Sequence, residues 1–145
     1  MQRSKIENYH HLVWATWSRE PFIEARHERA IFGCIRAEIL KLKCEALALN
    51  GMPDHVHLVV KVHSMVAIAR LAQAVKGVSS QMANDNLGFE GAFKWQDCYA
   101  SFSLSRTHVA RAVRYVDRQK IHHARGNVWD EWEETDLEMD LELDG

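Results

Sequence analysis

Apolar and polar positions alternate along residues 55–62, where His55, His57, Val59 and Lys61 separate four aliphatic residues. Alternation with a period of two in a β-branched run predicts a half-buried strand. Side chains two residues apart leave the same face, so the two histidines should share one face with their Cα atoms roughly 6.5–7 Å apart. They could converge on one ion or phosphate oxygen, or they could be ordinary strand histidines, one near a turn and one hydrogen-bonded at the edge of the core.

Three other segments have strand character. Residues 9–17 are rich in aromatic and β-branched side chains, residues 44–49 form a short apolar run, and residues 95–105 alternate again. The residues at 50–54 include Asn-Gly and Pro-Asp pairs, which favour a turn. The second strand and the histidine strand should therefore form an antiparallel hairpin.

Two longer segments have helical periodicity. Residues 24–43 carry Ile31, Ile35 and Ile39 at spacings of four, with charged residues between them, and residues 66–83 repeat the pattern. Both segments predict amphipathic helices that bury one side.

A third helix is expected after residue 105, with Ser105 or Thr107 as its N-cap. At about 100° per residue, Val109, Val113 and Val116 lie on one side. The opposite side gathers His108, Arg111, Tyr115, Arg118, Gln119 and His122. This placement puts the tyrosine off the apolar stripe, among cationic and amide side chains.

The order of elements is βαββαβ followed by a helix, which predicts an α+β, ferredoxin-like antiparallel sheet. Two helices should cover one face and leave the other open, with the tyrosine on the C-terminal helix. At 145 residues the chain is too short for a β/α-barrel metallohydrolase of ~250 residues. Its long helical segments also argue against a cupin-type barrel of many short strands.

Charge divides the chain into a body, residues 1–127, and an acidic tail, residues 128–145. Residues 1–129 hold all 18 lysines and arginines and 11 of the 20 acids, a net charge of +7, and the last sixteen residues carry −9. A basic body suggests a polyanionic partner. The alternating acids at 136–144 could form an edge strand, could be a solvated tail, or could cover the basic surface until DNA displaces them.

The remaining composition indicates one globular domain, with 47% hydrophobic residues and two prolines. Cys34, Cys44 and Cys98 are odd in number and widely spaced, so they are expected to be reduced core thiols. No apolar stretch predicts a membrane span or a signal peptide, and the protein is expected to be cytoplasmic.

Five segments, taken in order, carry a family resemblance. They are Tyr9-His10-His11-Leu12-Val13-Trp14 with Arg19-Glu20-Pro21-Phe22; Asn50-Gly51-Met52-Pro53-Asp54-His55-Val56-His57-Leu58; Lys76-Gly77-Val78-Ser79-Ser80; Trp95-Gln96 with Tyr99-Ala100-Ser101-Phe102-Ser103; and Tyr115-Val116-Asp117-Arg118-Gln119. Together they resemble the single-tyrosine HUH transposases of small insertion sequences and their REP-associated relatives. The resemblance covers nearly all of the body and none of the tail.

The resemblance implies that His55, His57 and Gln119 bind Mg²⁺ or Mn²⁺ and that Tyr115 is the nucleophile. The substrate would be single-stranded DNA flanked by a hairpin, cleaved through a 5′-phosphotyrosine intermediate by a homodimer. Two imidazoles alone would suit a softer metal than magnesium. A phosphotyrosine link would conserve the energy of the broken bond, so rejoining the strand would not require ATP. This agrees with the absence of a Gly-x-x-x-x-Gly-Lys nucleotide-binding loop.

Several residues are candidates for contacts with DNA. From helix geometry, Arg111 and Arg118 could hold the phosphate or lower the pKa of the Tyr115 phenol. Residues Lys76 and Ser79 are implied by the resemblance, and the candidates for base stacking are Trp17, Trp95, Trp129 and Trp132.

Three other functions fit parts of the pattern. A non-catalytic ferredoxin-like nucleic-acid-binding module would not need the His-x-His and Tyr-x-x-x-Gln motifs. A domesticated relative that processes genomic hairpins would have the same catalytic residues. A metallohydrolase that uses water would stay active when Tyr115 is replaced by Phe.

Overall fold

The computed structural model describes residues 5–125, apart from the side chains of His122 and Arg125. The predicted acidic strand and the candidates Trp129 and Trp132 lie outside the described residues. Within the described part of the chain, no helix is long and apolar enough to cross a membrane.

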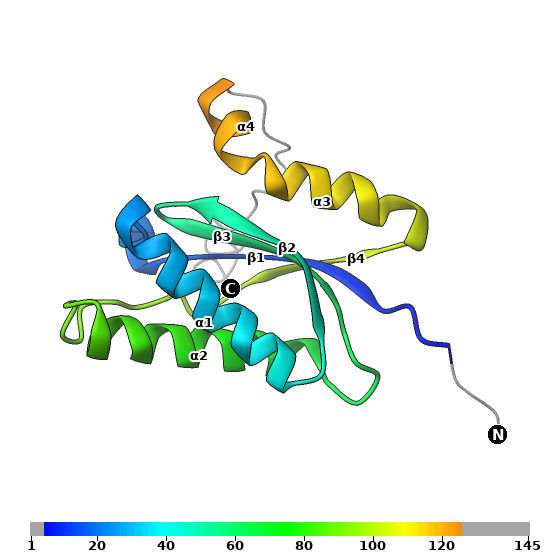
Figure 1. Ribbon diagram of the computed structural model, residues 1–145, viewed down its shortest axis with the longest axis horizontal. Coiled ribbons are helices and arrows are strands. Elements are labelled where there is room, and N and C mark those ends of the chain that lie inside the picture. Colours follow the sequence, from blue (N-terminus) through cyan, green and yellow to red (C-terminus); the bar gives the residue numbers. More distant parts are fainter. Residues whose placement is uncertain (1–4, 126–145) are drawn as a thin grey trace, which may run out of the picture.

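Four antiparallel strands form one sheet in the order β2-β3-β1-β4. Helices α1 and α2 lie on one face, and α3 and α4 lie on the other (Figure 1). The elements are β1 (Tyr9–Ala15), η1 (Trp17–Arg19), α1 (Ala25–Lys41), β2 (Glu45–Met52), β3 (His55–Lys61), α2 (Ile68–Asn86), β4 (Ala100–Leu104), η2 (Arg106–His108), α3 (Val109–Asp117) and α4 (Gln119–Arg125). The predicted α+β, ferredoxin-like fold is confirmed.

The main core lies between the sheet and the pair α1 and α2. Leu12 and Trp14 of β1 and Leu58 of β3 meet Ile35 of α1 and Leu71 of α2, and all five side chains are fully buried. Burying an aliphatic side chain of this size contributes roughly 1.5–3 kcal/mol. This core fixes which face of β3 the histidines occupy, because the aliphatic residues of the strand point the other way.

The prediction that one sheet face stays open is wrong over β2 and β3. Helix α3 packs there through Ala112, Tyr115 and Val116, which contact Ala48 and Val59 in a second core cluster. Strand β3 is therefore buried on both faces instead of half-buried. The alternation of the strand could not show this, because the covering helix comes some fifty residues later in the chain.

The predicted hairpin between β2 and β3 is confirmed, with Met52 paired to His55 across a turn at Pro53 and Asp54. Gly51 belongs to β2 and pairs with Val56. A Cβ at Gly51 would clash with the carbonyl oxygen of His55. The close approach of the two backbones therefore requires glycine at this position.

Three predicted boundaries need correction. The first strand ends at Ala15, and the fourth begins at Ala100, with Trp95 making an isolated bridge to Thr16. The final helix is broken at Arg118, where φ is −104° and ψ is 21°. Neither Ser105 nor Thr107 caps it through its side chain; the two hydroxyls lie 3.0 Å apart and contact each other.

Candidate active site

The two histidines of β3 point to the face covered by α3 and α4. His55 is 1% exposed and His57 is 0% exposed, and their ring centroids are 5.1 Å apart. The structure therefore brings together the pair that the period-two alternation places on one face. Ring nitrogens held this close can act on the same group.

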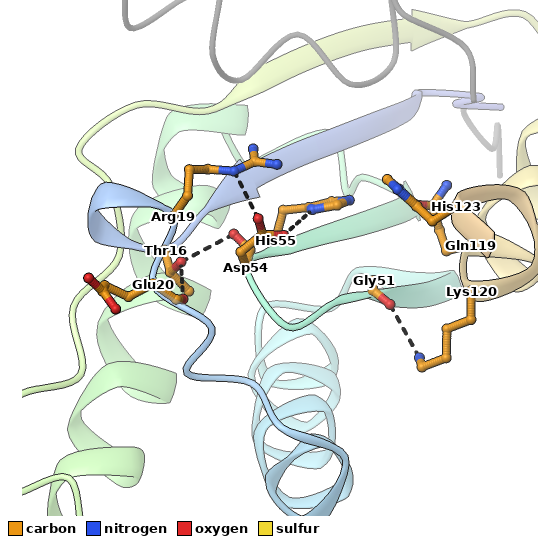
Figure 2. A network of polar contacts seen from close by, with 9 residues as sticks. All are labelled: Thr16, Arg19, Glu20, Gly51, Asp54, His55, Gln119, Lys120 and His123. Atoms are coloured by element: carbon orange, nitrogen blue, oxygen red, sulfur yellow. Dashed lines mark hydrogen bonds and ion pairs between the residues drawn. The ribbon is translucent and has the colours of Figure 1, made fainter. Parts of the chain in front are cut away.

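Asp54 holds the ring of His55 and a neighbouring arginine. The Nδ1 atom of His55 lies 2.8 Å from Oδ1, and the Nε of Arg19 donates to Oδ2 at 3.1 Å. Figure 2 shows both bonds meeting at the Asp54 carboxylate. Burial acts to raise the pKa of this carboxyl, but the hydrogen bonds and charges of His55 and Arg19 outweigh it and lower the pKa below its usual value. A bond from Nδ1 to an ionised carboxylate fixes the ring orientation and turns Nε2 to the opposite side.

A third histidine, His11 of β1, orients His57. Its Nε2 lies 2.9 Å from Nδ1 of His57, and the side chain is 0% exposed. His11 was not among the site residues predicted from the sequence. The position of His11 could have been predicted from the alternation of the first strand. Leu12 and Trp14 face the main core, so His11 must lie on the opposite face, with the histidine pair.

Tyr115 lies against both of these histidines. Its ring centroid is 5.9 Å from that of His57 and 6.4 Å from that of His11, with edge-on geometry in each case. The side chain is 3% exposed and belongs to the second core cluster with Ala112 and Val116. The prediction that Tyr115 stands off the apolar side of its helix is therefore wrong. The buried side of α3 is the one that carries Ala112 and Val116, because these residues contact Ala48 and Val59 of the sheet.

Gln119 is the first residue of α4 and is completely buried. Its Oε1 lies 3.1 Å from Nε2 of His123, whose ring centroid is 4.9 Å from that of His55 (Figure 2). Among the described residues, Nε2 of Gln119 has no hydrogen-bond partner. The oxygen and nitrogen of a side-chain amide are told apart by their hydrogen bonds. If the Gln119 amide were rotated by 180°, Nε2 would donate to His123 and the oxygen would occupy the position without a partner.

This arrangement has a donor set that fits a divalent ion. The described part of the chain holds no group of three His, Cys, Asp or Glu side chains suited to a metal. The buried amide of Gln119 bonds to His123, which lies against His55, and it would add an oxygen ligand to the two imidazole nitrogens. Imidazole nitrogens suit Zn²⁺ or Ni²⁺, whereas an amide oxygen suits the harder ions Mg²⁺ and Mn²⁺.

The other candidate residues belong to two regions. Arg111 is exposed on α3, and Arg118 is exposed at the break between α3 and α4. Lys76 donates to the carbonyl oxygens of Gln96, at 2.5 Å, and Cys98, at 3.3 Å. It therefore ties α2 to the segment before β4.

Ser79 and Trp95 pack together in the main core, and Nε1 of Trp95 donates to Oγ of Ser79 at 2.9 Å. Trp17 is 44% exposed and stacks with Lys94, whose Nζ lies 3.8 Å from the ring centroid. Contacts of these side chains with DNA stay predictions.

The fold has close counterparts among solved structures. The crystal structure of a candidate transposase from Deinococcus radiodurans R1 has a TM-score of 0.64 at 24% identity, covering 82% of this chain and 96% of that one. The structure of a REP-associated tyrosine transposase bound to a REP hairpin also has a TM-score of 0.64, at 12% identity, covering 88% and 74%. The chain has the fold of a tyrosine transposase.

The sequence comparisons give the family. The ISDra2 transposase TnpA of Deinococcus radiodurans is 24% identical over an alignment of 115 residues, and the alignment covers 76% of this chain and 82% of that protein. The family model described as "Transposase IS200 like" matches residues 4–119. The chain therefore belongs to the IS200-like transposase family, whose members cleave and transfer DNA.

Proposed function

We propose that the protein cleaves and rejoins single-stranded DNA next to hairpins, with Tyr115 as the nucleophile. The observation that carries the proposal is the packing of the Tyr115 ring against His57, 5.9 Å between centroids, with Gln119 buried one turn further on. A tyrosine that served only to fill the core would not need two buried histidines against its ring. The REP hairpin bound to the structural relative supports a hairpin substrate.

In the proposed reaction the phenolic oxygen of Tyr115 forms a bond to the scissile phosphorus. The bond from phosphorus to the 3′ oxygen breaks, the phenol loses its proton, and the 3′ oxygen takes one up. This leaves a 5′-phosphotyrosine and a free 3′-hydroxyl. Attack of a 3′-hydroxyl on the phosphotyrosine reverses the step and rejoins a strand, with no other energy source.

The surrounding residues supply what a phenol needs, because its ordinary pKa near 10 makes it a poor nucleophile. We infer that His55, His57 and Gln119 hold Mg²⁺ or Mn²⁺, which when bound would polarise a non-bridging oxygen of the scissile phosphate. Asp54 and His11 fix the two imidazole rings. Exposed Arg111 and Arg118 attract the DNA backbone near Tyr115, and a loss of less than tenfold in cleavage in the Arg→Ala variants would remove them from this role.

The test is covalent capture. Wild-type protein and Tyr115→Phe are incubated with end-labelled hairpin DNA that carries single-stranded flanks, in Mg²⁺, Mn²⁺ or EDTA, and run on a denaturing protein gel. We expect a metal-dependent protein–DNA band that Tyr115→Phe lacks. Tyr99→Phe, at a half-buried tyrosine before β4, is the matched control and should retain the band.

Two other results would overturn the proposal. Cleavage that survives Tyr115→Phe would mean that water is the nucleophile. Binding of the hairpin by wild-type protein without cleavage in either metal would indicate a non-catalytic nucleic-acid-binding module. Since a domesticated relative would give the same band, the assay tests the chemistry and not the mobility of the gene.

A further inference from the structure

A cleft opens beside the histidine strand, at the end where β3 begins. Its volume is about 420 Å³, and it is lined by Arg19, Pro21, Met52, Pro53, Asp54, His55 and His123. His55 forms part of its wall, so the cleft borders the histidine pair of β3. Figure 2 shows Arg19 and His123 on opposite sides of His55.

The backbone that presents Arg19 has an uncommon conformation. Ser18 and Arg19 are consecutive non-glycine residues with φ angles of 53° and 55°. Thr16 holds this segment: its hydroxyl donates to the carbonyl oxygen of Glu20 at 2.6 Å, and its own carbonyl accepts from the amide of Arg19 at 3.1 Å. Left-handed residues of this kind persist only where the surroundings impose them, and they gather at ligand sites.

The ion pair of Arg19 with Asp54 does not by itself explain this conformation. The side chains of Arg19 and Asp54 are each 30% exposed, so solvent screens the attraction between them. The bond from Nε to Asp54 does fix the plane of the guanidinium beside the cleft.

We propose that Arg19 binds a phosphodiester group of the single-stranded flank as the strand enters this cleft beside the scissile phosphate. The planar fork of an arginine matches two phosphate oxygens, and orientation by a carboxylate adds to that match. Asp54 then positions two side chains at once, His55 for the catalytic group and Arg19 for the strand. The inference rests on the proposed function, because it takes the strand at this site to be DNA.

The experiment measures binding by fluorescence anisotropy across a range of salt concentrations, in EDTA to prevent cleavage. The probes are a labelled DNA hairpin with single-stranded thymidine flanks and the same hairpin without flanks. For single strands the slope of log affinity against log salt changes by roughly 0.7 for each phosphate contact. Arg19→Gln should lose about that much slope and several-fold affinity on the flanked probe, and neither on the flankless one.

Two variants separate this contact from a merely structural role. Arg19→Lys keeps the charge and should restore the slope while regaining only part of the affinity. Asp54→Asn removes the carboxylate charge and one of its two acceptor oxygens without removing the cation, so its slope should be no smaller than that of the wild type. Arg36→Gln, at an exposed position on α1 across the sheet, controls for the loss of a distant charge.

The proposal is overturned if Arg19→Gln keeps the wild-type slope, if it weakens both probes equally, or if Asp54→Asn reduces the slope as much as Arg19→Gln does. These outcomes are independent of covalent capture. An unchanged slope with a Tyr115 adduct refutes the Arg19 contact alone. A reduced slope without any adduct refutes the proposed chemistry and leaves the contact in place.

Discussion

Asp54 links a protonation equilibrium to the stability of the fold. Its pKa is lowered in the folded state by the bonds and charges of His55 and Arg19, in spite of burial. The unfolded chain therefore binds more protons than the folded chain as the pH falls. The stability that this carboxylate contributes is present above the ordinary aspartate pKa of about 3.9 and is lost as the pH drops through the lower, folded value.

The pH dependence of this stability can be measured by comparing the wild type with the Asp54→Asn variant. In urea unfolding, the wild type should exceed the variant in free energy of unfolding by a constant amount from neutral pH to about pH 5, and the difference should shrink below about pH 4. Asp85→Asn, at an exposed position on α2, corrects for general charge effects. A difference that persists or grows in acid would contradict the bonding described for Asp54.

Some residues of the candidate site could be predicted from the sequence and others could not. The period of a strand places His55 and His57 on one face before any tertiary contact is known. The bond between His11 and His57 spans 46 residues, and only the packed sheet creates it. Helical periodicity predicted that the side with the three valines is the buried one, and this left Tyr115 on the exposed side. Which side chains of α3 contact the sheet depends instead on where the helix docks.

Among the elements, the hairpin of β2 and β3 determines where the histidine pair sits. Gly51→Ala would place a methyl group against the His55 carbonyl, with Cα of Val56 at 3.0 Å, and backbone atoms cannot turn away as a flexible side chain can. We expect a loss of about 1–3 kcal/mol in the free energy of unfolding, the usual cost of overpacking. Equilibrium urea unfolding measures it.

The matched control for that substitution is Gly33→Ala on α1. Nothing lies within 4 Å of the Cβ it would gain, and alanine is the better helix former. It should therefore stabilise the protein, by up to roughly 1 kcal/mol. If Gly51→Ala were as stable as Gly33→Ala, the close approach of the two strands described here would be wrong.

Element type was predictable from the sequence, and element ends were less so. The amphipathic patterns of α1 and α2 and the turn at Pro53 depend on neighbouring residues only, and these predictions are confirmed. The fourth strand was expected from residue 95, but Trp95 leaves the ladder to pack against Trp14, with ring centroids 5.9 Å apart. The break at Arg118 could not be predicted, because no proline or glycine lies at that position.

For the whole molecule, Tyr115 and His57 meet within one chain. The family resemblance implies a homodimer, and the packing of α3 on its own sheet places Tyr115 beside His57 of the same chain. We therefore predict a site built from one chain. A mixture of Tyr115→Phe and His57→Ala proteins should then form no covalent adduct with flanked hairpin DNA. Each variant mixed with wild type serves as the control, and a band restored by mixing the two variants would show that chains share the site.

The order βαββαβ was enough to predict the sheet and the two helices on its first face, since short connections leave few alternatives. It could not predict that α3 covers the second face, because that depends on the shape of the surface around Ala48 and Val59. The covering helix is also what buries Tyr115 beside the histidines. The part of the fold that was not predicted is therefore the part that assembles the candidate site.

The most direct measurement identifies the residue that carries the DNA. The covalent complex formed by wild-type protein on flanked hairpin DNA is trimmed with nuclease, digested with protease and analysed by mass spectrometry. We predict a 5′-linked nucleotide on the phenolic oxygen of Tyr115. A nucleotide on any other residue, or cleaved DNA with no modified peptide at all, would contradict it.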